Sequence, residues 1–385
     1  MEKHVYEEFD GYAHVAEERE VALRRGVPFN AECDSAERYI DLLHPPRLKL
    51  RVADIIDETP TTKTLRLVSE SLYLPPFLAG QYISLFVEIG AVRTGRPYSI
   101  SSPPSQVGYY DITVKRVEGG LVSNYLLDAV KQGDRFESSG PAGHFYHNPL
   151  FHDPTTVLLG GGSGITPFMS MVREIVERGL RRTVHIFHGS RTLEDAIFHG
   201  ELEHLSSRFD HIHYVPVIEN PPGGYKGRVG LITGELLREE LGSVGGKTFY
   251  VCGPQAMYEF CEAELKKLGV ARRKVRRELY GPPANICEDP GWPRSVAPDA
   301  SFTVRVNGKH EVKAPARQPL LVTLEQSGLA VPSLCRSGEC SMCRVKVVSG
   351  KVYQPPWVPV RKSDGWWGYV HACVSYPLEP LEVLM

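Results

Sequence analysis

The sequence predicts a chain of three folded domains behind a helical extension: an antiparallel β-barrel, an α/β domain with a parallel sheet, and a small β-rich domain. Three observations predict this order. Short β-rich runs come first, apolar strands alternate with helical patterns in the middle, and a β pattern returns after a Pro-rich stretch. The length of 385 residues agrees with two or three domains, since single domains usually have roughly 100 to 200 residues.

The domain boundaries follow from changes in this pattern. Residues 1–46 are charged, look helical and end near the Pro pair of "HPPR", where a helix should stop. The barrel is expected over 47–150, with runs such as "QYISLFVEI", and the α/β domain over 151–282, with strands such as "TTVLLG". A Pro-rich linker is expected over 283–299 and the last domain over 300–385.

The composition excludes several classes of function. The apolar fraction is 42%, the charged fraction 23% and the formal net charge −2, which gives no electrostatic reason to bind nucleic acid. The N-terminus is charged, and no run reaches the roughly 18 apolar residues of a membrane-spanning helix. We therefore expect a cytoplasmic protein with no nucleic-acid partner and no membrane span.

Four cysteines near the C-terminus have the spacing of a metal site. Cys335, Cys340 and Cys343 follow C-x4-C-x2-C, and Cys373 comes 29 residues after the third. This pattern is typical of plant-type [2Fe-2S] clusters. Structural zinc is the alternative, but it usually takes paired C-x2-C knuckles and this loop has one such pair. The other cysteines share no ligand spacing and are expected to be buried small hydrophobes: Cys33, Cys252, Cys261 and Cys287.

The barrel region carries two segments suited to an anionic ring ligand. "GRPYSISS" places Arg96, Tyr98 and Ser99 at the end of a strand, and "EGGLVSN" places Gly120 and Ser123 where a helix begins. A guanidinium can fork onto a phosphate, a tyrosine offers a flat face, and a helix N-terminus attracts anions. Each segment alone is equally well explained by a strand with an exposed tyrosine and a capped helix.

The α/β region opens with the segment "VLLGGGSGITP", in which a strand enters a glycine run and a helix leaves it near Thr166. Glycines let the backbone approach a pyrophosphate, and the helix N-terminus faces its charge. The run departs from G-x-G-x-x-G, so an ordinary tight turn is the alternative.

In chain order, R-x-Y-S at Arg96, "GPAGHF", "GGGSGITP" and "YVCGP" resemble the ferredoxin-NAD(P)H reductase superfamily. The domain order is similar to that of its flavin reductases with a C-terminal plant-type ferredoxin domain, the phthalate dioxygenase reductase and phenylacetyl-CoA epoxidase reductase types. The resemblance covers the chain from Leu48 to Met385. It implies a β-barrel flavin domain, an α/β nucleotide domain and a β-grasp ferredoxin domain.

The resemblance also implies roles for individual residues. The flavin would be bound by Arg96, Pro97, Tyr98, Ser99, Lys115, Val117, Gly120 and Ser123. The nicotinamide nucleotide would be bound by Gly162, Gly164, Thr166, Arg191, Cys252, Gly253 and Pro254. Hydride transfer would take place beside Tyr98, Ser99 and Cys252. The cluster would be held by Cys335, Cys340, Cys343 and Cys373.

The resemblance favours particular cofactors within each class. FAD is expected rather than FMN, because "SGPAGHFY" resembles the segment that FAD-binding members place beside the pyrophosphate and adenine. NADH is slightly favoured over NADPH. Arg191 could pair with a 2'-phosphate, whereas Glu194 and Asp195 would disfavour one.

These parts imply one sequence of electron transfers. A nicotinamide gives up two electrons as a hydride and a [2Fe-2S] centre accepts one, so a flavin must stand between them. The implied activity is an NAD(P)H:acceptor oxidoreductase that passes electrons singly to a protein acceptor, either an oxygenase component or another redox enzyme. The alternative is an electron-transfer or redox-sensing subunit of a larger complex that does not oxidise NAD(P)H efficiently. The intact "GGGSGITP" and "CGP" segments favour the first.

Overall fold

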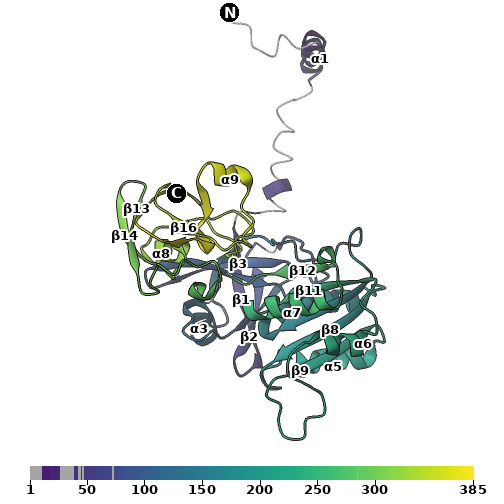
Figure 1. Ribbon diagram of the computed structural model, residues 1–385. Helices are drawn as coiled ribbons and strands as arrows, with labels where there is room; N and C mark the ends of the chain where they lie inside the picture. Colours follow the sequence, from purple (N-terminus) through teal and green to yellow (C-terminus); the bar gives the residue numbers. More distant parts are fainter. Residues whose placement is uncertain (1–10, 27–38, 42–44, 46, 72, 284) are drawn as a thin grey trace, which may run out of the picture. The chain divides into compact units, whose positions relative to one another are not determined.

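The computed structural model describes residues 11–26, 39–41, 45, 47–71, 73–283 and 285–385 (Figure 1). The chain divides into two units, Met1–Pro46 and Arg47–Met385. In the first unit, helix α1 (Tyr12–Arg24) has no buried residue, and Arg24 pairs with Glu20 one turn earlier. The sequence position Cys33 lies outside the described residues.

The second unit begins with an antiparallel β-barrel. Its strands are β1 (Leu48–Thr59), β2 (Thr62–Ser69), β3 (Tyr82–Ile89), β4 (Val92–Ser99), β5 (Tyr110–Lys115) and β6 (Arg135–Ser138). They pair in the order β4-β3-β6-β1-β2-β5, and a bridge between Ile100 and Ile112 brings the two edges together. Burial alternates at the start of β1, where Leu48, Leu50 and Val52 enter the core. This is the period-2 pattern of a strand with one buried face. Helix α3 (Leu121–Asp128) packs on the same core.

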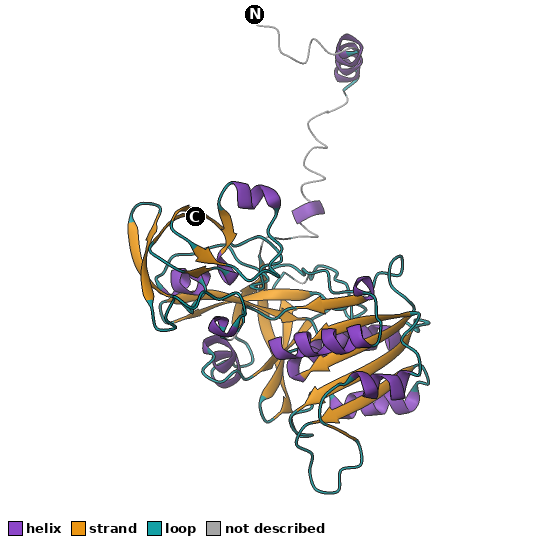
Figure 2. Cartoon of the chain, in the orientation of Figure 1, coloured by secondary structure: helices purple, strands orange, loops and turns teal. Residues whose placement is uncertain are grey.

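A six-stranded parallel sheet follows, with helices on both faces (Figure 2). Its strands are β7 (Thr155–Gly161), β8 (Thr183–Ser190), β9 (Ile212–Ile218), β10 (Arg228–Val229), β11 (Lys247–Cys252) and β12 (Val275–Glu278), in the order β10-β9-β8-β7-β11-β12. Helices α4 (Thr166–Glu177) and α5 (His199–Arg208) share one core cluster with the sheet. Helices α6 (Gly234–Leu241) and α7 (Gln255–Lys267) share another. Short 3-10 turns, η2 (Gly162–Ile165) and η3 (Arg272–Lys274), complete the domain.

The C-terminal domain is a five-stranded mixed sheet with one covering helix. Strands β13 (Ser301–Val306), β14 (His310–Pro315), β15 (Arg344–Ser349), β17 (Tyr369–His371) and β19 (Leu381–Leu384) pair in the order β14-β13-β19-β15-β17. The first and last strands, β13 and β19, are parallel neighbours, and α8 (Leu320–Gln326) packs on the sheet. This is the β-grasp arrangement. The remaining elements are α9 (Lys362–Trp366), η5 (Ala372–Val374) and the pair β16 (Val352–Tyr353) and β18 (Tyr376–Pro377).

The predicted linker over 283–299 is packed along its described part. Ile286 of η4 (Ile286–Glu288) and Trp292 are buried in a small cluster with Tyr376 of the C-terminal domain. The ring of Trp292 meets the rings of Tyr353 and Tyr376 edge-on, at centroid distances of 5.4 and 6.2 Å. The proline content gave no sign of this, because the apolar residues that anchor the segment are isolated in the sequence.

The predicted three-domain architecture of barrel, parallel sheet and small β domain is confirmed. Among the described residues, no helix is both long and apolar enough to cross a membrane.

Candidate redox centre

Arg96 lies in β4 in a partly buried position, and among the described residues none of its hydrogen bonds goes to a carboxylate. Its Nη1 donates to Thr94 Oγ1 at 2.5 Å and to the Gly95 carbonyl oxygen at 2.8 Å, and both acceptors are neutral. Burial, together with the nearby guanidinium of Arg336, lowers the pKa of Arg96 to about 10. A partly buried cation bonded only to neutral acceptors suits an anionic ligand such as a phosphate.

The other barrel residues predicted to hold a flavin lie around this strand and the start of α3. Tyr98 packs against the barrel core, and Pro97 beside it is half-buried. Ser123 Oγ accepts a hydrogen bond from the Val117 amide at 3.2 Å, so it closes the turn that leads into α3. Gly120 sits directly beneath Ser123, where a side chain would collide with the hydroxyl. The turn therefore leaves the first amides of α3 available to an anion.

The glycine run lies where the order of the parallel sheet reverses. The chain passes from β7 outward to β8 and β9 on one side, and returns to β11 and β12 on the other. Ligands of such sheets bind in the crevice at the carboxyl ends of the strands at this point. Gly162 follows β7 there, with φ of +52°, and Gly253 follows β11.

The two segments pack backbone to backbone. A side chain at Gly164 would collide with the carbonyl oxygen of Cys252, and one at Gly161 would reach Met257 and Gly253. Thr166 Oγ1 donates to the Ser163 carbonyl at 2.7 Å and fixes the start of α4. Lys115, at the end of β5, brings its Nζ to 3.6 Å from the position that a Cβ on Gly162 would take. The structure therefore brings the barrel and the glycine run together.

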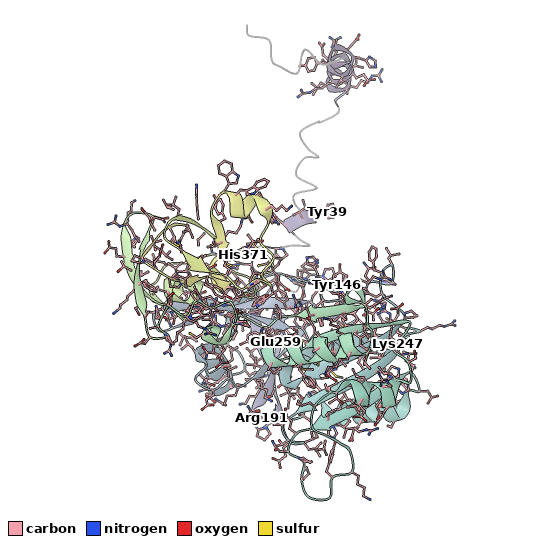
Figure 3. The ribbon with its side chains drawn as sticks, viewed as in Figure 1. Tyr39, Tyr146, Arg191, Lys247, Glu259 and His371 are labelled. Atoms are coloured by element: carbon pink, nitrogen blue, oxygen red, sulfur yellow. The ribbon has the colours of Figure 1, made fainter. Side chains whose placement is uncertain are left out.

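Arg191 and Pro254 occupy the flanks of this crevice. Pro254 is the N-cap residue of α7, immediately after Gly253. Arg191 is exposed on the loop that follows β8, as Figure 3 shows, and its carbonyl accepts from the Asn220 amide at 2.7 Å. Asp195 of the same loop accepts a hydrogen bond from Thr61 of the barrel at 2.9 Å.

A compact polar group joins the barrel to the ends of β11 and β12. Ser99 Oγ and Tyr280 Oη are 2.8 Å apart, and the thiol of Cys252 contacts the hydroxyls of Tyr258 and Tyr280. Cys252 is fully buried, and burial raises its pKa well above the ordinary value. A neutral thiol beside two hydroxyls is suited to lining a ring ligand rather than to nucleophilic attack.

Two residues of this group were not predicted from the sequence: Tyr280 and Glu278, the last residue of β12. Burial raises the pKa of Glu278 well above its ordinary value, the nearby Glu339 raises it further, and a hydrogen bond with Ser99 opposes both. Its Oε2 is buried and without a partner in the described part of the chain. An unpaired buried carboxyl oxygen is costly, so the site fits a polar ligand that would bond it. The strand that it ends reads Val-Arg-Arg-Glu, so three of its four residues are charged and the sequence offered no signal that singled out Glu278.

Three of the four C-terminal cysteines lie on one loop. The sulfur atoms of all four contact each other in succession. Contacts run from Cys340 to Cys335, then to Cys373, and from there to Cys343. Backbone amides point at the sulfurs: Ser337 and Cys340 donate to Cys335 Sγ at 3.4 and 3.3 Å, and Cys335 donates to Cys340 Sγ at 3.5 Å. Such amide–sulfur bonds stabilise thiolate ligands.

The backbone of this loop is shaped for a compact ligand. Gly338 has φ of +83°, and a Cβ there would lie 2.9 Å from Val374 and 3.1 Å from Val358. Arg336 and Ser341 also adopt positive φ, of 56° and 59°. His371, labelled in Figure 3, lies 2.7 Å from the Gly338 carbonyl through its Nδ1. Non-glycine residues with positive φ have a strained backbone, and such strain is typical of functional loops.

The contacts among the four sulfurs bear on the nature of the metal group. A [2Fe-2S] cluster spreads four thiolates over two irons, and the succession of sulfur contacts fits that group. Of the cysteines expected to be buried, Cys252 and Cys261 are buried, whereas Cys287 is only half-buried.

Tyr82 lies between the cluster loop and the polar group at Ser99. It pairs with Ser99 across β3 and β4, and its ring approaches Gly143 of the "GPAGHF" segment. Burial and the nearby thiols of Cys335 and Cys340 raise the pKa of Tyr82. One buried side chain therefore has the cysteine loop and the Ser99 group as neighbours.

The comparisons with known proteins match each domain separately. An oxidoreductase FAD-binding domain matches residues 49–147, an oxidoreductase NAD-binding domain matches 158–263, and a 2Fe-2S iron-sulfur cluster binding domain matches 304–378. The expectation of FAD-, NAD- and [2Fe-2S]-binding domains is confirmed.

Relatives align with this chain over nearly their whole length. The glycine betaine monooxygenase reductase subunit of Pseudomonas aeruginosa is 30% identical over 346 residues, covering 85% of this chain and 92% of the relative. The NADH oxidoreductase HCR of Escherichia coli K12 is 31% identical over 332 residues, covering 86% and 95%. The structure of phthalate dioxygenase reductase is 25% identical, covers 88% of this chain and 97% of its own, and superposes with a TM-score of 0.64.

Proposed function

Because this chain belongs to the ferredoxin-NAD(P)H reductase superfamily, in the group that carries a C-terminal 2Fe-2S domain, we propose that it oxidises NADH and delivers electrons singly to a protein acceptor. The observation that carries the proposal is the position of Tyr82, which pairs with Ser99 across β3 and β4 and lies near the thiol of Cys335. Tyr82 would then border both the site for hydride transfer and the site for the cluster.

The flavin and the cluster, when bound, would supply the conversion of a two-electron donor into single-electron delivery. The side chains of the protein would hold and orient the flavin and the nicotinamide. The guanidinium of Arg96 would hold the flavin phosphate, with Ser123 and Gly120 presenting the first amides of α3 to the same charge. Tyr98 and Pro97 would line the ring, and Lys115 and Val117 would contact it through their backbone.

The residues at the crevice would place the nicotinamide against that ring. Gly162, Gly164 and Thr166 would receive the pyrophosphate, and Gly253 and Pro254 would bound the nicotinamide side. Ser99 and the neutral thiol of Cys252 would flank the reacting carbon, with the carboxyl of Glu278 bonded to Ser99. No general base is required, because hydride transfer depends on the alignment of two rings.

We propose NADH as the preferred donor. Asp195 is bonded to Thr61, and Glu194 is exposed on the same loop as Arg191, so two carboxylates lie near any 2'-phosphate that Arg191 could bind. A comparison of kcat/KM for NADH and NADPH tests this choice. A preference for NADPH that disappears in Arg191→Ala would contradict it.

We propose an oxygenase component as the acceptor, in a cytoplasmic location where reduced pyridine nucleotide is available. The support is the naming of the relatives, among them a monooxygenase reductase subunit. The domain limits at 47–150, 151–282 and 300–385 are part of the same proposal. Affinity purification of the chain from its own host, with identification of the bound protein by mass spectrometry, tests the acceptor.

The test of the whole proposal is anaerobic rapid mixing of the purified protein with NADH. We expect about one flavin and two irons per chain with matching sulfide and no zinc. The flavin absorbance should bleach first, and the signal of a reduced cluster should follow without any partner. Flavin that stays oxidised in the presence of NADH would favour the receiving-subunit alternative instead.

A further inference from the structure

A buried hydrogen-bonded network crosses the junction between the barrel and the ferredoxin domain. Thr94 of β4 is 6% exposed, and its Oγ1 donates to Glu325 Oε2 of α8 at 3.0 Å. The same oxygen accepts from Arg96 Nη1 at 2.5 Å. One hydroxyl therefore connects the residue proposed to hold the flavin phosphate with a carboxylate of the other domain.

On the ferredoxin side, the network continues into the cysteine loop. Glu325 accepts two hydrogen bonds from Arg336, at 2.7 and 2.9 Å, and both side chains are nearly fully buried. Arg336 directly follows Cys335, has φ of +56°, and brings its Nη1 to 3.4 Å from Thr94 Oγ1. A second contact, from Ser84 Oγ to the Leu334 carbonyl at 3.3 Å, joins the same loop to β3.

The charges of this network leave it short of an anion. Arg96 and Arg336 carry two positive charges, and Glu325 carries the one carboxylate bonded within the network. Like charges in a buried site repel strongly because water screens them little. Thr94, Gly95 and Glu325 also line a groove of about 890 Å³ between the two domains, which leaves room beside the network.

A phosphate at Arg96 would reduce this repulsion, so a bound flavin would favour the position of Arg336 and of the loop that follows Cys335. Coupling between two sites is reciprocal, because each ligand must change the affinity for the other by the same factor. The seated ferredoxin domain would therefore also strengthen the hold on the flavin. The hydroxyl of Thr94 bonds Glu325 and Arg96 and lies 3.4 Å from Arg336 Nη1, so it holds both guanidiniums in the positions at which a phosphate at Arg96 would relieve their repulsion.

We propose that Thr94 is a positioning residue that couples flavin binding to the seating of the ferredoxin domain, and so sets the rate of electron transfer from flavin to cluster. This inference rests on the proposed function, since it takes Arg96 as the phosphate ligand. Thr94 touches neither the nicotinamide crevice nor a cysteine sulfur, so its effect on hydride transfer is indirect.

The experiment is hydrogen–deuterium exchange on the full-length protein with and without flavin, followed at α8 and residues 335–343. In the parent, removal of flavin should increase exchange in both segments. In Thr94→Val, which keeps the shape and removes the hydroxyl, exchange should no longer depend on flavin. Thr94→Ser restores the hydroxyl and should behave like the parent. Thr113→Val, which removes another buried barrel hydroxyl, is the matched control and should retain the parental response.

Two further readouts separate positioning from a general loss of structure. Flavin should dissociate roughly 5- to 150-fold more readily from Thr94→Val, the range typical of coupled sites. Reduction of the cluster after mixing with NADH should slow about tenfold while bleaching of the flavin stays within about twofold of the parent. Iron and sulfide content reports whether the variant has kept its cluster. If Thr94→Val has lost the cluster, Thr94→Ala is used in its place.

The proposal is overturned if exchange in Thr94→Val responds to flavin as in the parent, or if Thr94→Ser fails to restore the response. Arg96→Ala distinguishes this failure from that of the proposed function. If Arg96→Ala loses flavin while exchange in Thr94→Val responds to flavin as in the parent, the coupling is contradicted and the proposed phosphate site stands. If Arg96→Ala binds flavin as tightly as the parent, Arg96 is not the phosphate ligand, and the coupling that depends on it is contradicted as well.

Discussion

The cysteine loop and the proposed hydride-transfer face are built in opposite ways. The loop gathers three sulfurs within residues 335–343, and its own amides bond them at 3.3 to 3.5 Å. The face takes Ser99 from the barrel, and Cys252 and Glu278 from two neighbouring strands of the parallel sheet. Local backbone conformation holds the first site, whereas the packing of two domains holds the second. A substitution that destroys one site should therefore leave the other assembled, apart from the coupling proposed through Thr94.

The strongest test of that independence is Cys340→Ser. Serine is a harder and less acidic ligand than a thiol, so the cluster should not assemble stably. Reduction of a protein acceptor should fall by at least about 100-fold, while NADH bleaches the flavin at nearly the parental rate. Rapid mixing with NADH and a cytochrome or oxygenase acceptor measures both steps. Cys287→Ser, outside the loop, should keep iron and both activities. Loss of both steps in a folded, flavin-loaded Cys340→Ser would contradict the comparison.

Arg96→Ala tests the opposite failure, of the flavin site alone. Removing a charge-assisted hydrogen-bond partner of a phosphate should weaken flavin binding by about 10- to 100-fold, with iron content unchanged. Equilibrium dialysis with flavin fluorescence measures the affinity. The matched control is Arg93→Ala on the same strand, whose exposed side chain pairs with Glu88. Equal flavin affinity in the two variants would argue against Arg96 as the phosphate ligand.

Gly338→Ala examines how far the loop depends on its local backbone. A side chain there requires φ of +83° and would lie 2.9 Å from Val374, so the loop should lose about 1 to 3 kcal/mol of stability. Faster loss of iron to a chelator is the expected readout. Gly308→Ala is the control, because Gly308 has φ of +67° but open space around it. A cluster as durable in Gly338→Ala as in Gly308→Ala would show that crowding at this site is unimportant.

Ser99→Ala probes the assembled face with a smaller expected effect. Loss of its hydrogen bonds to Glu278 and Tyr280 should slow hydride transfer about tenfold, equivalent to a barrier higher by about 1.4 kcal/mol. Flavin bleaching under single-turnover conditions measures this step, with flavin and iron contents as controls. An unchanged bleaching rate would place the reacting carbon away from Ser99.

The smallest expected effect is a pH dependence of stability at the glycine run. His188 is fully buried with Nε2 3.2 Å from the Gly162 carbonyl, and burial lowers its pKa to about 4. The unfolded chain takes up this proton below about pH 6.5 and the folded chain does not, so stability falls as pH decreases toward 4.

The loss attributable to His188 should reach about 1 kcal/mol at pH 5.5. His188→Gln should flatten the fall in thermal midpoint between pH 7 and 5.5 relative to the parent. The exposed His204→Gln serves as the control for removing a histidine. A parallel pH profile in His188→Gln and the parent would contradict a neutral buried imidazole at this position.

Features that depend on neighbours along the chain could be predicted from the sequence. The order of barrel, parallel sheet and β-grasp domain followed from periodicity and resemblance, and the cysteine pattern followed from spacing, because three of the four proposed ligands lie within one loop of nine residues. The tertiary structure alone decided which distant residues meet. It placed Glu278 and Tyr280 beside Ser99, gave Thr94 a carboxylate partner 231 positions away, and packed Trp292 of the predicted linker into a core. Such contacts depend on strand order and domain packing, which no local pattern of residues encodes.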